Sequence, residues 1–435
     1  MAYAFRGGIF FTSDKKTKDG TIERPAPPKT LLIPLKDVSR LTVPVGSRVL
    51  CGQLLALPQR GTAAIHSPVS GTVAAVEPEP FGVTVRIEND GTYELSPDIR
   101  KMDKKLADCT AEEIIDRIAV AGIVDSDGGE PVSEKLTQAL GHVDTCIINC
   151  VATEPYISCD GRVAAEDPAA VVNGLKIFLR ALGIRRGVIA LSEGDPEVSK
   201  KIGGMVKNSR MISVVVCRAK YPQEDAKRLV YAVTGHELPA GADPSARGCV
   251  IFNVQACAAV YNAFVTGMPQ TKRVVTVSGD CVRRPVNVEV PIGTRFSELL
   301  EYAGGTTREP DVILDGGPLS GHTASLNFTV GKTTKALLLM SERMTDKYNG
   351  QPVCIKCGRC VSACPERLMP NYLYNYLRDG KTREAVDFGI LSCVGCGLCS
   401  YICPGKAPVA ELIADFKRKH NEKKRSDDEA VEADA

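Results

Sequence analysis

The period of hydrophobic and polar positions changes several times along the chain, and each change suggests a domain. Residues 30–93 hold short alternating segments between Gly and Pro turns, which predicts a small β-sandwich or barrel. Residues 110–270 alternate amphipathic helical stretches with apolar runs such as TCIINC and ISVVVC, which predicts a Rossmann-like α/β domain around a mainly parallel sheet. Residues 272–335 return to β character with two strands, a turn and one helix, which fits a small β-grasp domain.

The segments at the two ends have patterns of their own. Residues 1–29 are an N-terminal arm that is polar and Pro-rich from residue 13 onward, so we expect it to be extended. Residues 345–412 carry two cysteine-rich runs with helical segments between them. The helical stripe there is formed by Tyr372, Leu373, Tyr376 and Leu377. Residues 415–435 are basic and then acidic without an apolar period, which predicts a disordered tail.

Composition narrows the classes of function. A chain of 435 residues is too long for one core, and a net charge of +2 with 5% aromatic residues gives no reason to expect nucleic acid as a partner. No apolar run reaches the ~18–20 residues of a membrane-spanning helix, and the N-terminus lacks the pattern of a signal peptide. We therefore expect no transmembrane segment and a reducing cytoplasm, where clusters among the 17 cysteines indicate metal or redox chemistry.

Eight cysteines fall in two runs with the same spacing, C-x2-C-x2-C-x3-C-P. In bacterial two-cluster ferredoxins with this spacing, three thiolates hold one [4Fe–4S] cluster and the fourth ligates the other cluster. Structural zinc is the alternative, but its four ligands leave the third cysteine of each run unexplained. We predict two [4Fe–4S] clusters with crossed ligands: Cys354, Cys357, Cys360 and Cys403 for cluster one, and Cys364, Cys393, Cys396 and Cys399 for cluster two.

The stretch GQLLALPQRGTAAIHSPVSGTVAAV, residues 52–76, resembles lipoyl- and biotinyl-type domains. That resemblance implies a barrel-sandwich hybrid for residues 30–93. Such carrier domains present a Lys at the tip of a hairpin, whereas this chain has HSPVSG there. We therefore expect a lipoyl-like domain without covalent lipoate or biotin.

Several further stretches match one known family. They are FRGGI at 5–9, NCVATEPY at 149–156, KYPQ at 220–223, IFNVQACAAVYNAF at 251–264, VTVSGDCV at 275–282 and GGPLSG at 316–321, together with the two cysteine runs. On these residues nearly the whole chain resembles RnfC, the C subunit of the Rnf complex, which couples ferredoxin and NAD redox chemistry to ion transport. The resemblance implies an α/β domain similar to the flavin-carrying subunit of respiratory complex I, an SLBB-type β-grasp domain and a two-cluster ferredoxin-type domain.

The resemblance also implies a site for FMN and NADH, which it places on Gly128, Gly129, Lys135, Asn149 and Glu154. The loop within 121–136 departs from the family, because Asp125, Asp127 and Glu130 stand where small residues belong. A phosphate cradle needs glycines and unopposed N–H groups, and carboxylates there repel the phosphate. Two alternatives stay open: a site that takes FMN and NADH, and a retained scaffold without a nucleotide. We expect the second.

The patterns and the resemblance together predict an electron-transfer subunit of a larger oxidoreductase or translocase, with no catalytic residues of its own. Its partners would be other subunits of a membrane complex, or a partner reductase or ferredoxin, and it would lie peripherally at the inner face of the membrane. One alternative is a soluble RnfC-like carrier that feeds a dedicated reductase such as proline reductase and has no NADH or FMN site. Another is a scaffold or ligand-binding module whose clusters are structural.

Overall fold

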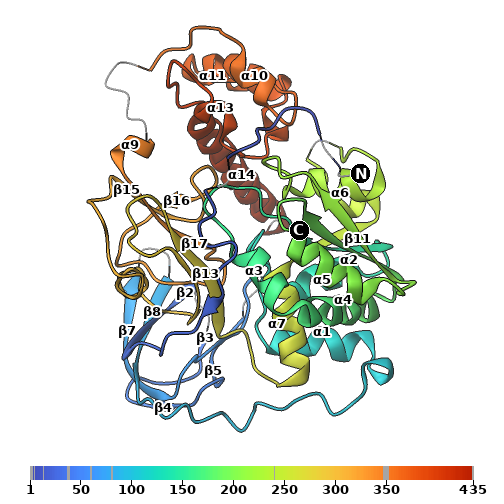
Figure 1. Ribbon diagram of the computed structural model, residues 1–435, viewed down its shortest axis with the longest axis vertical. Coiled ribbons are helices and arrows are strands. Elements are labelled where there is room, and N and C mark those ends of the chain that lie inside the picture. Colours follow the sequence, from blue (N-terminus) through green and yellow to red (C-terminus); the bar gives the residue numbers. More distant parts are fainter. Residues whose placement is uncertain are drawn as a thin grey trace.

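The computed structural model describes residues 3, 5–12, 14–36, 40–58, 61–79, 82–239, 241–345 and 352–433. Four successive parts of the chain occupy separate regions in Figure 1, from the blue strands at the lower left to the orange and red helices at the top. The predicted fold class, a multidomain α/β and β protein with a helical C-terminal domain, is confirmed.

The first part is a pair of small antiparallel sheets. One sheet has the order β2 (Thr30–Lys36), β8 (Gly82–Asn89), β7 (Gly71–Glu79) and β4 (Arg48–Val49), and the other has β3 (Arg40–Leu41), β5 (Leu54–Leu57) and β6 (Ile65–His66). Alternate side chains of β2 and β8, namely Leu31, Ile33, Val85 and Ile87, are fully buried in a core that also includes Leu55 of the second sheet. This two-sheet architecture is the predicted sandwich.

The second part is an α/β domain with four parallel strands in the order β11 (Ile212–Cys217), β10 (Arg186–Ser192), β9 (Thr145–Cys150) and β12 (Cys249–Asn253). Its helices are α1 (Ala111–Val120), α2 (Val132–Ala139), α3 (Cys159–Glu166), α4 (Pro168–Leu182), α5 (Pro196–Val206), α6 (Ala226–Thr234) and α7 (Val254–Val265), with 3-10 turns at Leu106–Asp108 and Pro244–Arg247. The chain adds strands on one side of β9 and then returns to place β12 on its other side, so the strand order reverses between β9 and β12.

Both faces of this sheet are buried. Ile148 and Phe252 point into the large core shared with α1, α4 and α7, where Phe252 stacks on Phe178 with ring centroids 4.2 Å apart. Ile147 and Ile251 point to the opposite face, which α6 covers. Burial on both faces explains why the strands are continuous apolar runs rather than alternating ones.

The third part is a six-stranded β-grasp sheet. Its order is β1 (Ile22–Glu23), β14 (Val286–Pro291), β13 (Lys272–Ser278), β17 (Ala336–Met340), β15 (Val312–Asp315) and β16 (His322–Thr323), with α8 (Phe296–Tyr302) packed on it and α9 (Glu342–Thr345) after it. The N-terminal arm supplies β1, which pairs in parallel with β14. Lys332 joins three parts, because its Nζ donates to the carbonyl of Ala64 at 2.7 Å and to that of Gly122 at 2.5 Å.

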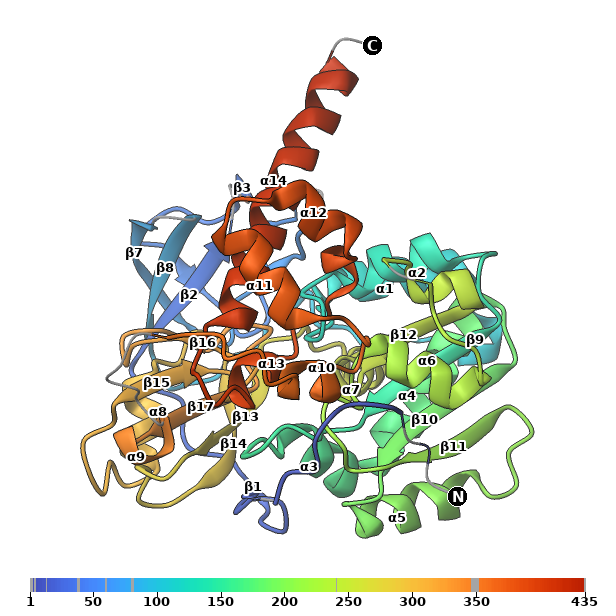
Figure 2. The same cartoon turned by 90° about the horizontal axis from the view of Figure 1, so that it is seen from above.

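The fourth part is a group of short helices that lies on top of the α/β and β-grasp domains (Figures 1 and 2). It comprises α10 (Arg359–Ala363), α11 (Pro370–Arg378), α12 (Thr382–Asp387), α13 (Leu398–Tyr401) and α14 (Val409–Ala433), with a 3-10 turn at Ile390–Ser392. The predicted helical stripe is on α11, where Leu373 is fully buried. None of the helices in the described part of the chain has both the length and the apolar composition that crossing a membrane requires.

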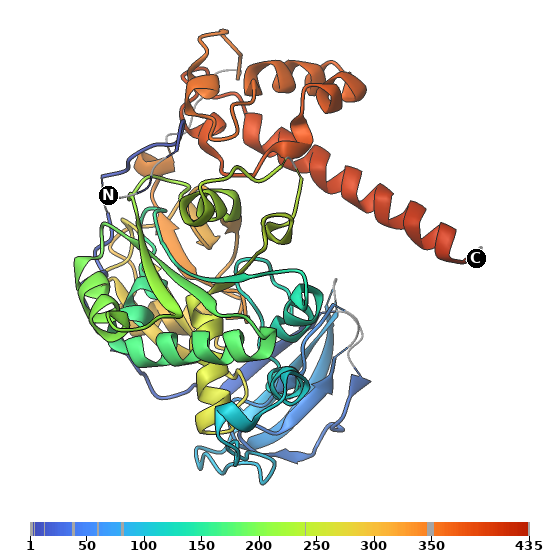
Figure 3. The ribbon, with the colours of Figure 1, turned by 90° about the vertical axis from the view of Figure 1, so that its right-hand side faces the viewer.

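The tail differs from the sequence prediction. The segment 415–435 was expected to be disordered, but α14 continues through it as far as Ala433 and projects from the body (Figure 3). Ion pairs one helical turn apart, Asp415 with Lys419 at 2.7 Å and Arg418 with Glu422 at 3.3 Å, follow the helical period. A charged segment without an apolar stripe is therefore helical here because such pairs and good intrinsic propensity support it.

Candidate functional site

The two cysteine runs have the same backbone. Each run begins its short helix, α10 or α13, after a glycine in the left-handed conformation. Positive φ recurs at three matching pairs of positions: Lys356 and Gly395, Gly358 and Gly397, and Arg367 and Lys406. The runs are therefore two copies of one structural unit, and α10 packs against α13.

The second run and the last cysteine of the first run lie around one cavity of about 420 Å³. Its cysteines are Cys364, Cys393, Cys396 and Cys399, the set predicted for cluster two. Among the described residues, no three His, Cys, Asp or Glu side chains are grouped closely enough for a single metal ion. A tetrahedral zinc site, with sulfurs about 2.3 Å from the ion, would draw the thiols closer together. A cavity of this volume lined by four thiols has room for a larger group, such as an iron–sulfur cluster.

The cysteines predicted for cluster one do not line that cavity. The backbone N–H of Val353 donates to the carbonyl of Gly405 at 3.1 Å, which brings the segments of Cys354 and Cys403 together. Cys360 is buried on α10, whereas Cys357 is exposed. This set therefore reaches the protein surface.

The FRGGI stretch of the N-terminal arm contacts the first run. Gly7 and Gly8 both have φ near +69°, and the N–H of Gly8 donates to the carbonyl of Ala363 at 2.9 Å. A Cβ atom on Gly7 would clash with the carbonyl of Cys364. Glycine is required here for both its left-handed conformation and its close approach to a cysteine.

The α/β domain also contacts this region. The hydroxyl of Tyr221 donates to the carbonyl of Cys396 at 2.9 Å. Glu366, with 9% of its side chain exposed, pairs with Lys227 at 2.7 Å and with Arg228, both on α6. These contacts hold the cysteine cavity against the α/β domain.

The second candidate site is the crevice where the strand order of the α/β sheet reverses. Asn149 near the end of β9 and Asn253 at the end of β12 are paired across the sheet, and α7 starts directly after Asn253. In open α/β sheets, ligands bind outside the carboxyl ends of the strands at such a reversal, and helix N-termini there favour anions.

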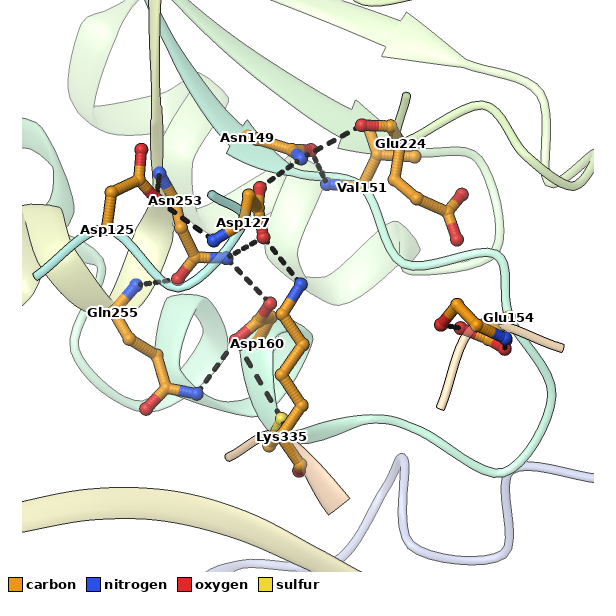
Figure 4. Close-up of polar contacts among 12 residues, drawn as sticks. Asp125, Asp127, Asn149, Val151, Glu154, Asp160, Glu224, Asn253, Gln255 and Lys335 are labelled. Atoms are coloured by element: carbon orange, nitrogen blue, oxygen red, sulfur yellow. Dashed lines mark hydrogen bonds and ion pairs between the residues drawn. The ribbon is translucent and has the colours of Figure 1, made fainter. Parts of the chain in front are cut away.

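Carboxylates of the loop between α1 and α2 occupy this crevice (Figure 4). Asp127 accepts hydrogen bonds from Asn149 at 2.9 Å and from Asn253 at 3.2 Å, and it pairs with Lys335 of the β-grasp domain. Asp125 accepts from the backbone N–H of Asn253 at 3.2 Å and pairs with Lys135 at 2.8 Å. The donors that would hold a phosphate are thus engaged by the protein itself, and this loop does not fit an FMN phosphate.

Glu154 lies apart from these residues (Figure 4). Its carboxylate accepts from the N–H groups of Leu319 and Ser320, both at 2.8 Å, and from the Ser320 hydroxyl at 2.6 Å. The GGPLSG loop closes on it so tightly that a Cβ on Gly317 would clash with the carboxylate. The same loop packs on the second run, because a Cβ on Gly397 would lie 2.7 Å from the Leu319 carbonyl.

Glu224 follows the KYPQ stretch and is largely enclosed. Burial raises its pKa to about 7, against the effect of a hydrogen bond from Thr153. Its backbone carbonyl accepts from Asn149 at 3.2 Å. The backbone of Glu224 therefore stands beside the crevice, while its side chain bonds Thr153.

Of the predicted nucleotide residues, Lys135 and Asn149 reach the acidic loop, Glu154 does not, and Gly129 supplies a turn with φ of +75°. A Cβ on Gly128 would meet nothing closer than 3.9 Å, so no neighbouring group requires glycine there. Sequence reasoning missed Asn253, which the strand-to-helix junction in IFNVQA marks as a cap position. It also missed Lys335, for which the local sequence holds no signal.

The fold and the two sites define a class: an iron–sulfur electron-transfer protein built around a flavoprotein-like α/β domain. Comparison with known families agrees part by part. The matches are an RnfC barrel sandwich hybrid domain at 3–92, a Nuo51 FMN-binding domain at 118–262, an SLBB domain at 274–321 and a 4Fe-4S dicluster domain at 353–407.

Curated relatives extend this comparison to most of the chain. The C subunit of the ion-translocating oxidoreductase complex of Rhodobacter capsulatus is 34% identical over 90% of this chain and 78% of its own length. The protein of the same name from Yersinia enterocolitica is 33% identical over 82% of this chain and 53% of its own length. The chain belongs to the RnfC family.

A solved structure shares the fold. The NAD+-reducing [NiFe]-hydrogenase in its air-oxidised state aligns over 71% of this chain and 62% of its own, with a TM-score of 0.51 and 17% identity.

Proposed function

We propose that this chain is the electron-transfer subunit of an Rnf-type complex and that it moves single electrons through two [4Fe–4S] clusters. Its family and its 4Fe-4S dicluster domain support this function. The observation that carries the proposal is that Cys364 of the first run and three cysteines of the second run line one cavity. The two-cluster spacing requires such an arrangement, because the fourth cysteine of each run ligates the other cluster. A bound [4Fe–4S] cluster accepts and releases one electron at a time.

The proposed ligand sets differ in their surroundings. One set is Cys364, Cys393, Cys396 and Cys399, whose cavity touches the α/β domain through Asp225. The other is Cys354, Cys357, Cys360 and Cys403. Because Cys357 is exposed, we place the contact with a redox partner at its set, which is the set predicted for cluster one. The α/β domain then serves as a docking scaffold that binds neither FMN nor NADH.

Other subunits of a membrane complex would hold this chain at the inner face of the membrane. A second candidate function is that of a carrier for a dedicated reductase, which the occupied crevice of the α/β domain favours. Affinity purification of the tagged chain from its own host distinguishes the two, because the copurifying proteins are membrane subunits in the first case and a reductase in the second.

The direct test is anaerobic purification followed by metal, sulfide and flavin analysis. We expect about eight iron and eight sulfide per chain, no FMN after acid release, and cluster reduction by a low-potential donor but not by NADH. A colourless, zinc-rich protein would overturn the cluster assignment. Clusters that never reduce would support a structural role, and stoichiometric FMN with NADH-driven reduction would overturn the flavin-free scaffold.

A further inference from the structure

The crevice between β9 and β12 has the donors of an anion site. Two side-chain amides, from Asn149 and Asn253, and the ammonium of Lys335 converge on one point. The N-terminus of α7, a helix of 12 residues, begins beside them. Such a set is what parallel α/β sheets use to hold the phosphate of a nucleotide.

The group at that point is the carboxylate of Asp127. One of its oxygens, Oδ2, accepts from the Asn149 amide, and the other, Oδ1, accepts from both Asn253 and Lys335. Burial alone would raise the pKa of Asp127, but Lys335, Asn149 and Lys135 outweigh it and keep the pKa below its ordinary value. In turn, Asp127 and Asp160 raise the pKa of Lys335 and outweigh the lowering effect of desolvation. Both partners are therefore charged at neutral pH.

Asp127 and Asp125 play different parts in the loop. The side chain of Asp125 is 1% exposed and is neutralised by Lys135 of the same domain. The side chains of Asp127 and Lys335 remain 27% and 30% exposed, so solvent reaches this pair. Removing the Asp127 carboxylate would free Lys335 and one N–H of each amide, while Asn149 keeps its bond to the Glu224 carbonyl and Asn253 keeps its bond to Asp160. The Asp125–Lys135 pair would stay intact.

We propose that Asp127 is an internal anion that takes the place of a ligand phosphate, and that its carboxylate is what keeps phosphate-bearing nucleotides out of this crevice. The inference deepens the proposed function and rests on its flavin-free α/β domain. A phosphate held by Lys335 and the two amides would lie within a few ångströms of the Asp127 carboxylate and would be repelled by it. Asp127 also draws Lys335 of the β-grasp domain onto the α/β domain, so the occupied crevice joins the two.

The test is a fluorescence titration of the full chain with FMN, and with riboflavin as a ligand that lacks the phosphate. We expect Asp127→Ala to bind FMN roughly tenfold or more tighter than the wild type, with riboflavin affinity unchanged and inorganic phosphate competing. The double variant Asp127→Ala/Lys335→Ala should lose the gain. Asp415→Ala, which removes an exposed paired aspartate on α14, is the matched control and should behave as the wild type.

Two results would overturn the inference. One is FMN affinity in folded Asp127→Ala equal to that of the wild type, and the other is an equal gain for FMN and riboflavin, which would mean that space rather than charge was the obstacle. If Asp127→Ala does not fold, Asp127→Asn removes the charge while keeping the shape and decides the question in the same assay. Stoichiometric FMN in the wild type is a separate result, because it would refute the flavin-free scaffold before any variant is made.

Discussion

The cysteine cavity and the α/β crevice both lie where domains meet, but their donors face different surroundings. Four thiols surround an open space of about 420 Å³. The amides of Asn149 and Asn253 and the ammonium of Lys335 surround a carboxylate of the protein. The α/β domain matches an FMN-binding family over 118–262 while its anion position is filled from within. A fold can therefore be kept while its site is neutralised, and function has to be argued from the site.

The two regions are also joined, since the cysteine domain rests on the α/β domain through Tyr221 and Glu366. The GGPLSG loop touches both sides, holding Glu154 of the α/β domain and packing on Gly397 of the second run. If the α/β domain is a scaffold, these contacts are its main contribution to electron transfer, because they fix where the thiols stand.

The largest effect is expected from removing the crossed ligand of the cysteine cavity. We expect Cys364→Ala to lose about half of the iron, and its remaining paramagnetic signal should match that of Cys396→Ala rather than that of Cys357→Ala. Anaerobic iron analysis and electron paramagnetic resonance measure this. Cys51→Ala, a buried cysteine outside both runs, is the control and should keep all of the iron. A spectrum that matches Cys357→Ala would contradict the ligand sets.

The contact between the regions can be weakened at Glu366. Glu366→Ala leaves Lys227 and Arg228, both largely buried, without their carboxylate. Removing one partner of a buried ion pair lowers the free energy of unfolding by about 3–5 kcal/mol, which denaturant unfolding measures. The matched control is Glu237→Ala, which breaks the exposed pair with Arg367 and should change stability by less than about 1 kcal/mol. Equal effects of the two variants would refute the docking role.

The side chain of Glu224 makes the stability of the folded protein depend on pH. The folded-state pKa of Glu224, about 7, lies above its ordinary value of 4.5, so the folded protein prefers the protonated side chain. Stability is therefore lost as the pH rises from about 4.5 through 7.

Glu224→Gln should remove this loss. We expect the variant to match the wild type at acidic pH and to be more stable by up to about 3 kcal/mol above neutral pH. Thermal unfolding across this range measures the difference, with the exposed Glu112→Gln on α1 as the control. A stability difference that does not change with pH would show that ionisation of Glu224 does not destabilise the folded protein.

The contact of Glu154 with the GGPLSG loop links the α/β domain to the second run. Glu154→Gln loses a charged acceptor for the GGPLSG loop, which should lower the free energy of unfolding by roughly 1–2 kcal/mol. Because Leu319 packs on Gly397, the signal of the second-run cluster should shift while that of the other cluster stays the same. Ser320→Ala, which removes one of the three bonds, should give a smaller shift of the same kind. A change confined to the other cluster would contradict the contact from Glu154 through the GGPLSG loop to the second run.

The order of elements and the chemistry of the C-terminal domain could be predicted from the sequence. Apolar runs such as TCIINC and the stripe on α11 predict their elements because burial follows the local period of the chain. Cysteine spacing predicts the cluster type because four ligands within eleven residues are constrained by local geometry. Asp125 and Asp127 could also be recognised from the sequence, since they stand where the family has small residues.

The contacts of Asp125 and Asp127 could be known only from the folded structure. Lys335 lies 208 residues from Asp127 along the chain, and Asn253 lies 126 residues away, so no local pattern joins them. In the same way, the contact of Gly7 with Cys364 and the grip of the GGPLSG loop on Glu154 depend on how domains pack. Local periodicity determines which face of an element is buried, but contacts between distant segments form only when the whole chain is folded.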